Sequence, residues 1–171
     1  MSDQAIRVPA GLTTEGLLAR RYMARLIDSV IISLMIASVI ALSGVQVPQV
    51  GGDTLSVLFS VLLCLILWIG YGTAFEASPW QATLGKRLMR LRVYDSQAGR
   101  LVLIHAAGRN LLKDGPFLAF GLIPGGQVLS LIWLGAHLVV LHRSPVYQAI
   151  HDRVAHTWVA ASEEVTQLHL T

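Results

Sequence analysis

The sequence has little cysteine and little charge. Its single cysteine, Cys64, cannot form a disulfide within the chain, and we interpret it as a small buried hydrophobic residue. Only 13% of the residues are charged, compared with about 25% in an ordinary soluble protein. A soluble chain this poor in charge could not cover its surface with polar groups, whereas a chain surrounded by lipid has no such need. Because 54% of the residues are hydrophobic, the composition predicts an integral membrane protein.

Several kinds of functional site are also missing. The net charge of +3 is not gathered into a basic stripe with stacking residues, so no nucleic-acid partner is expected. The sequence contains no phosphate-cradling glycine loop, no Gly-x-Ser-x-Gly elbow and no Cys–His pair, so we expect neither an enzyme nor a cofactor. His137 and His142 are five residues apart, as are His151 and His156, which places neither pair on one helical face. No metal site is therefore predicted.

Two long apolar runs occupy residues 22–44 and 55–75. At about 1.5 Å per residue, each can cross a hydrocarbon core about 30 Å thick. Two charged residues interrupt the first run, and none interrupts the second. Tyr71 lies toward the end of the second run, where aromatic rings favour the membrane interface, and Glu76 follows it as an expected solvated acid. We therefore expect two membrane crossings here.

The apolar segment 117–141 allows two interpretations. It is either one crossing of 25 residues or a helical hairpin broken at 124–126, where Pro-Gly-Gly disfavours a continued helix and favours a tight turn. We prefer the hairpin, with helices at about 105–123 and 127–142, because it gives an even number of crossings. An even number keeps both termini on the same side of the membrane.

The basic residues predict the orientation in the membrane. Residues 76–115 carry seven of the thirteen lysines and arginines, and by the positive-inside rule this stretch is cytoplasmic. The amino-terminal region is also basic, so we expect a multipass protein of a bacterial inner (plasma) membrane with both termini in the cytoplasm. The expected organisation is a cytoplasmic tail over 1–14, a transmembrane domain over 15–160 and a second cytoplasmic tail over 161–171.

Two segments on the predicted cytoplasmic side are similar to each other. Residues 81–88, Gln-Ala-Thr-Leu-Gly-Lys-Arg-Leu, align with 148–154, Gln-Ala-Ile-His-Asp-Arg-Val, with one gap. Upstream, the basic segment 21–25 is similar to 109–113. The pattern indicates a parallel duplication of about 70 residues, in which each unit is a basic helix, a hairpin and a Gln-Ala segment. Chance similarity is the alternative.

Residues 91–102 predict extended structure. Residues 91–94 alternate, 95–99 form a turn, and 100–102 can return as a second strand. Because a hairpin of this size is marginal alone, we expect it to pack on the helices or on residues 157–160. The predicted fold class is an all-α membrane protein with about four membrane-entering helices and a small cytoplasmic β hairpin.

Charged residues gather near the start of the first apolar run. Arg21, Arg25 and Asp28 are spaced i, i+4 and i+7, so they share one face of a helix. A carboxylate inside an apolar stretch is costly unless it is paired or reached by water. We therefore expect Arg21 and Arg25 to pair with Asp28. A second aspartate, Asp152, follows a segment that is expected to return to the same face.

Four motifs occur in order along the chain: Arg-x-x-Ala-x-x-Ile-Asp at 21–28, Gln-Ala-Thr-Leu-Gly-Lys-Arg-Leu at 81–88, Leu-Arg-Val at 91–93 and His-Asp-Arg-Val-Ala-x-Thr at 151–157. Together they resemble the RDD family of bacterial membrane proteins, over nearly the whole chain. His156 stands where that family often has glycine.

The resemblance implies specific site residues and a possible activity. The family is named for one arginine and two aspartates, which correspond here to Arg21, Asp28 and Asp152. It implies a multipass membrane protein, and some members have been proposed to exchange sodium or other monovalent cations for protons.

Two functions follow for Arg21, Asp28 and Asp152. In the first, the chain is transport-related, and the two carboxylates bind a monovalent cation or a proton alternately. In the second, the three residues form a salt-bridge cluster that staples the tail to the first helix, and the chain is a non-catalytic scaffold or accessory subunit. The expected partners are membrane lipids, monovalent cations, protons and further copies of the chain in a homo-oligomer.

The secondary candidates for the charge cluster are Arg25, Lys86, Arg87, Asp114 and Arg153. Lys86 and Arg87 are expected beside the membrane surface, where they bind anionic lipid headgroups or serve only as topology signals. Asp114 is either a third ion ligand or the ion-pair partner of Lys113 or Arg109.

Overall fold

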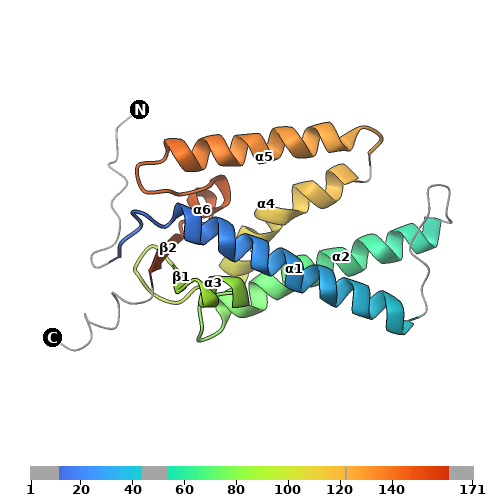
Figure 1. The fold of residues 1–171 in the computed structure, drawn as a ribbon, viewed down its shortest axis with the longest axis horizontal. Helices are drawn as coiled ribbons and strands as arrows, with labels where there is room; N and C mark the ends of the chain where they lie inside the picture. The colour runs from blue at the N-terminus through green and yellow to red at the C-terminus, as the bar shows by residue number, and fades with distance from the viewer. Residues whose placement is uncertain (1–11, 44–53, 122, 162–171) are drawn as a thin grey trace.

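The computed structural model describes residues 12–43, 54–121 and 123–161. It contains four long helices: α1 (Leu18–Ser43), α2 (Thr54–Ala77), α4 (Leu103–Gly121) and α5 (Gly126–Arg143). The short elements are α3 (Leu84–Leu88), β1 (Leu91–Tyr94), α6 (Ile150–Val154) and β2 (Trp158–Ala161). These short elements gather at the end of the molecule where α1 begins, and they form its polar end (Figure 1).

α1 and α2 are the two helices that are long and apolar enough to cross a membrane, among the described residues. The segments Leu18–Leu42 and Thr54–Ala77 have mean hydropathies of 2.1 and 2.3, and few of their residues are buried inside the molecule. Leu34 and Ile66, for example, are 63% and 59% exposed. Exposed leucine and isoleucine are costly in water but not in lipid. Both of the apolar runs predicted to cross the membrane are therefore helices with lipid-compatible surfaces.

The chain turns back between α4 and α5, as the hairpin interpretation predicted. α4 ends at Gly121 and α5 begins at Gly126. Gly125 has a φ of 75°, which residues with a side chain rarely adopt. A Cβ atom at Gly126 would lie 1.7 Å from the carbonyl oxygen of Phe120, so the turn has room only for glycine there. The interpretation of 117–141 as one continuous helix is wrong.

The two strands do not form the predicted local hairpin. β1 pairs antiparallel with β2, with Leu91 opposite Ala161 and Tyr94 opposite Trp158. The prediction of a return strand at 100–102 is wrong, because Leu101 is buried in the core at 1% exposure and α4 begins two residues later. β2 overlaps the alternative docking segment 157–160, so the strand partner comes from the far end of the chain.

The same order of elements occurs twice. A helical hairpin, a five-residue helix and a strand make up the first half (α1, α2, α3, β1) and again the second half (α4, α5, α6, β2), as Figure 1 shows. Gln81 and Tyr147 lie three residues before the two short helices and have φ values of 51° and 53°. Arg90 and His156 follow the helices at φ values of 53° and 50°. This local geometry supports the predicted duplication and aligns Gln81 with Tyr147, without a gap.

The hydrophobic core lies at the polar end rather than between the long helices. Both halves contribute to its main cluster, which consists of Leu17, Ala24, Leu91, Val93, Leu101, Ala106, Val159 and Ala161. The core thus fixes the sheet against the beginnings of α1 and α4. It holds in place the elements that carry the charged side chains.

Candidate functional site: a buried ion-pair network

Arg109, on α4, lies at the centre of a network of charged residues. Its side chain is 1% exposed. Nε and Nη2 donate to one oxygen of Asp152 at 3.0 and 2.6 Å, and Nη1 donates to Glu76 at 2.5 Å. A guanidinium has its N–H groups in a planar fork, so it can hold two carboxylates at once. Arg109 therefore ties α4 to α6, which carries Asp152, and to α2, which carries Glu76.

Glu76 is fully buried, so the expectation of a solvated acid at this position is wrong. It accepts hydrogen bonds from Arg109 and, at 2.9 Å, from the Asn110 side-chain amide, and it forms an ion pair with Lys86. The close contact between α2 and α4 explains the burial. A Cβ atom at Gly72 would lie 2.4 Å from the side-chain oxygen of Asn110, so this glycine lets the two helices approach.

Lys86, on α3, forms an ion pair with Glu76. The surroundings of Lys86 disfavour its protonated form. Burial and the nearby charge of Arg109 lower the pKa of Lys86 to about 8, against the attraction of Glu76. The Lys86 side chain is 14% exposed, so it is part of the interior of the polar end.

Asp152 joins the carboxyl-terminal half of the chain to α1. It is fully buried and forms an ion pair with Arg21, whose guanidinium also donates to the backbone carbonyl of Tyr147. The expectation that Asp152 returns to the face of α1 that carries Arg21 is confirmed. Burial raises the pKa of Asp152, but the neighbouring His151 and the two paired arginines outweigh it and hold the pKa well below its usual range.

Asp28 does not pair with the arginines on its own helix. Its Oδ1 accepts from the Tyr71 hydroxyl and from the Gly85 backbone N–H, both at 2.8 Å. Its Oδ2 accepts from the Thr83 hydroxyl at 2.6 Å. The predicted pairing with Arg21 and Arg25 is wrong. Tyr71, at 8% exposure, is a buried donor to Asp28.

The docking of α3 on α1 explains the partners of Asp28. Thr83 is the N-cap of α3, and the first turn of any helix has N–H groups without partners inside the helix. A Cβ atom at Gly85 would lie 2.2 Å from the carbonyl oxygen of Ala24. Glycine therefore lets the start of α3 close directly on Asp28, which satisfies the Thr83 hydroxyl and the Gly85 N–H.

Asp114, on α4, contacts two basic residues, Arg25 and Lys113. Arg25 forms an ion pair with one of its oxygens, and the Lys113 ammonium lies 3.3 Å from the other. Lys113 also donates to the side-chain oxygen of Asn110 at 2.6 Å. The predicted pairing of Asp114 with Lys113 is confirmed, and Arg25, rather than Arg109, is its other partner.

Two secondary candidates lie outside this network. Arg87 is exposed, and its guanidinium stacks over the Trp80 ring at 4.1 Å from the ring centroid. Arg153 is exposed on α6 next to the buried Asp152. Arg153 and Asp152 are separated because adjacent residues of a helix point in different directions.

The sequence interpretation missed a pair of histidines from different helices. Nε2 of His137, on α5, lies 3.1 Å from Nδ1 of His151, on α6, and the two rings stack. His151 also lies 3.4 Å from Asp152. Burial, together with the charges of Arg109 and Lys113, lowers the pKa of His151 well below its usual value despite the attraction of Asp152. His151 is therefore neutral near pH 7 and shares a hydrogen bond with His137.

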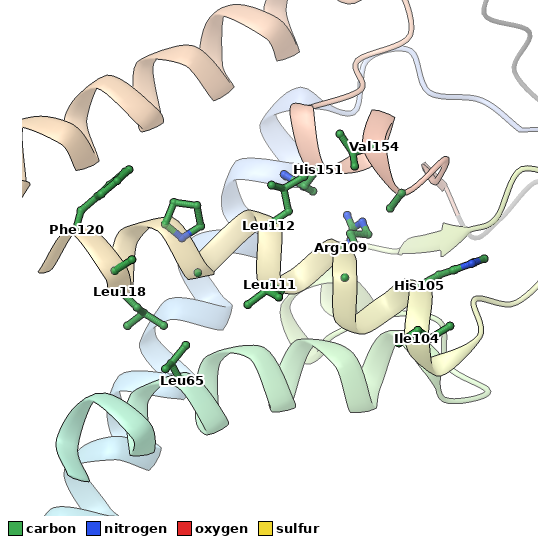
Figure 2. Close-up of a pocket in the computed structure, with 15 residues that line it drawn as sticks. Leu65, Ile104, His105, Arg109, Leu111, Leu112, Leu118, Phe120, His151 and Val154 are labelled. Atoms are coloured by element: carbon green, nitrogen blue, oxygen red, sulfur yellow. The ribbon is translucent and has the colours of Figure 1, made fainter. Parts of the chain in front are cut away.

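An apolar cavity of about 890 Å³ runs along α4, beside this network. Figure 2 shows Leu118 and Phe120 toward one end of it, and Arg109 and His151 closer to the polar end. Most of its lining surface is apolar and comes from α4, with Leu65 of α2 and residues of α6 completing it. In the described part of the chain, no three His, Cys, Asp or Glu side chains are arranged to hold a metal ion.

Two helices suited to crossing a membrane, with a buried ion-pair network at one end of them, define a helical membrane protein. The RDD family model matches residues 16–156, and the chain belongs to this family of membrane proteins. None of the curated proteins compared with the chain matches it.

Proposed function

We propose that the protein is a non-catalytic membrane module, a scaffold or accessory subunit, whose ion-pair network fixes the polar end to the transmembrane helices. The observation that supports this function is the pairing of the four buried acids in the described residues. Each of them is already held by donors of the same chain, and the four are Asp28, Glu76, Asp114 and Asp152.

The energetics of buried ion pairs favour a structural function over ion exchange. A cation that enters at Glu76 or Asp152 must displace Arg109, which is itself buried. Removing one partner of a buried pair costs about 3–5 kcal/mol, because the other charge is left uncompensated. A network in which the carboxylates are already paired with arginine is therefore better suited to stabilise the structure than to exchange ions.

We place this module in a bacterial inner membrane, with several crossings and with the polar end and both termini in the cytoplasm. The support is the concentration of lysine and arginine at this end, which is typical of cytoplasmic segments. The exposed apolar surfaces of α1 and α2 suit either lipid or a second copy of the chain, so a homo-oligomer is part of the proposal.

One observation favours a second function, the exchange of a monovalent cation for a proton through Arg21, Asp28 and Asp152. The three described donors to Asp28 are uncharged: two hydroxyls and one backbone N–H. Asp28 could therefore accept a proton or a cation without the loss of an ion pair. Its position two to three turns into α1 agrees with this role.

Proton flux in proteoliposomes separates the two functions. The purified protein and its Asp28→Asn variant are reconstituted, a gradient of Na⁺, K⁺ or Li⁺ is imposed, and internal pH is followed with a fluorescent dye. A structural module gives no flux above that of empty liposomes, and Asp28→Asn lowers the melting temperature. Flux in the wild type that disappears in a folded Asp28→Asn protein, but persists in the control Asp95→Asn, contradicts the proposal and establishes exchange.

A further inference from the structure

A second cavity, of about 190 Å³, lies between α1, α4 and α5 at the polar end. One acid lines this basic cavity, Asp28. Its cationic lining consists of Arg21, Arg25, Lys86, Arg109 and Lys113. A cleft whose lining carries an excess of one sign of charge within low-dielectric walls concentrates the field and attracts ions of the other sign. The cavity is therefore suited to an anion.

The charged residues around the basic cavity have a net positive charge. The five cations that line the basic cavity are opposed by four buried acids, Asp28, Glu76, Asp114 and Asp152, so one positive charge is unmatched among these residues. His151 also lines the cavity and is neutral near pH 7, so it does not change this balance. Charge in a partly buried site is costly unless an opposite charge compensates it. A singly charged anion would restore neutrality.

Arg25 and Lys113 have the donors for such an anion. The Arg25 side chain is 40% exposed, and its contact with Asp114 uses one of the five N–H groups of the guanidinium. Lys113 lies on the other side of the same carboxylate. A phosphate oxygen placed beside Arg25 would receive charge-assisted hydrogen bonds, and the ion pair with Asp114 would stay intact.

The shape of the basic cavity indicates an amphiphile rather than a free ion. The rings of Tyr22 and His142 stack with their centroids 6.2 Å apart, which bridges α1 and α5 at the polar end. From this bridge, the cavity continues along α5 past Leu138 and Leu134, which are 36% and 43% exposed. An inorganic anion gains nothing from leucine walls, whereas an acyl chain does.

We propose that the basic cavity binds the phosphate group of an anionic membrane lipid, with an acyl chain lying against Leu134 and Leu138 of α5. Basic pockets between transmembrane helices are suited to anionic headgroups, and each lysine or arginine near the membrane surface contributes about 1 kcal/mol of attraction. The site differs from Arg87 and the other exposed cations of the polar end, because four of its five cations, all but Arg25, are largely buried inside the helix assembly.

Lipid retention by the purified full-length protein tests the proposal. The protein in detergent is given equal amounts of phosphatidylglycerol and phosphatidylcholine, and bound lipids are counted by native mass spectrometry. We expect phosphatidylglycerol to be retained in preference. Arg25→Gln should weaken its retention about fivefold, the equivalent of about 1 kcal/mol, and Leu138→Trp should abolish it by filling the cavity with no change of charge.

Two matched controls distinguish this site from general attraction to the surface. Arg143→Gln removes an exposed cation at the end of α5, and Leu131→Trp adds the same bulk on a lipid-facing position of α5, where Leu131 is 67% exposed. Both should retain phosphatidylglycerol as the wild type does. Melting curves without lipid verify that every variant is folded.

Three results would overturn the proposal. One is equal retention of phosphatidylcholine, and another is a loss in Arg143→Gln as large as that in Arg25→Gln. The third is stabilisation of the lipid-free protein by millimolar inorganic phosphate to the extent given by phosphatidylglycerol, which would assign the site to a free anion. None of these outcomes depends on whether the protein exchanges cations.

Discussion

Arg109 donates two hydrogen bonds to the same oxygen of Asp152, from Nε at 3.0 Å and from Nη2 at 2.6 Å. Both residues belong to the second half of the chain, but each also binds the first half. Arg109 binds Glu76 of α2, and Asp152 binds Arg21 of α1. This pair therefore joins the two halves by charge, as the ion pair between Arg25 and Asp114 also does.

The first prediction concerns the acid of this pair. Asp152→Asn removes the negative charge that Arg21 and the fully buried Arg109 share. We expect the free energy of unfolding to fall by about 3–5 kcal/mol, because cations are left uncompensated in the interior. Thermal unfolding in detergent measures the change. Arg153→Gln, on the exposed side of the same short helix, is the control and should melt as the wild type does. Equal melting of both variants would contradict the role of the network.

The second prediction concerns the contact between α3 and α1. In Gly85→Ala the new Cβ atom would lie 2.2 Å from the carbonyl oxygen of Ala24 and 2.9 Å from the Asp28 carboxyl group. α3 must then move away and lose its hydrogen bonds to Asp28, at a cost of about 1–3 kcal/mol. Gly70→Ala is the control, since nothing lies within 4 Å of a Cβ atom there. A Gly85→Ala protein as stable as Gly70→Ala would show that the close approach is not required.

The third prediction concerns acid stability. The pKa of His151 is lowered in the folded protein, so below about pH 6.5 the unfolded chain takes up a proton that the folded chain does not. Stability contributed by a neutral His151 is therefore present above pH 6.5 and is lost as the pH falls. Lowering the pH from 7.5 to 5.5 should cost about 1 kcal/mol through this residue.

His151→Asn should flatten the dependence of the melting temperature on pH in this window. His105→Asn, an exposed histidine at the start of α4, should leave the dependence unchanged. Asp152 does not obscure the comparison. Its lowered pKa makes its own contribution disappear only at more acidic pH. If the melting temperature of His151→Asn depends on pH as that of the wild type does, the protonation of His151 is not coupled to folding.

The fourth prediction concerns the strand pairing. Arg92 lies opposite Ala160 in the sheet, and directly opposed residues have Cα atoms about 4.5–5.5 Å apart, which suits a disulfide. In a Cys64→Ser background, cysteines at 92 and 160 should form a disulfide on mild oxidation. Cysteines at 92 and 102, which a local hairpin would bring together, should not. The opposite result would restore the local hairpin.

The long helices could be predicted from sequence because their signals are local. Apolar runs of more than 20 residues, and Pro-Gly-Gly at 124–126, act on the residues that contain them. The strand pairing was harder, since residues 100–102 and 158–161 are equally extended in sequence. In the structure, residues 158–161 form β2 and pair with β1, whereas Leu101 packs in the core and α4 begins two residues later.

The charged site was predicted only in part. Glu76 was expected to be solvated, and Arg109 was expected only as a partner of Asp114, yet both belong to the buried network. Helical spacing placed Arg21, Arg25 and Asp28 on one face, yet spacing says nothing of the partners that other elements bring. Asp28 receives the start of α3, where N–H and hydroxyl groups need acceptors. Glu76 is buried by α4, and His137 meets His151 across two helices. Such contacts arise only when distant segments come together, so a reading of neighbours along the chain misses them.

The ion pair between Arg21 and Asp152 spans 131 positions of the sequence. A ribosome makes Arg21 early and Asp152 late, and chains fold from the amino terminus as they are made. The first hairpin must therefore wait, with Arg21 lacking its acid from α6, until the chain has been made through α6. A copy that stops before α6 keeps that unbalanced charge permanently. Incomplete copies should thus be unstable in the membrane and open to the proteases that remove poorly folded proteins.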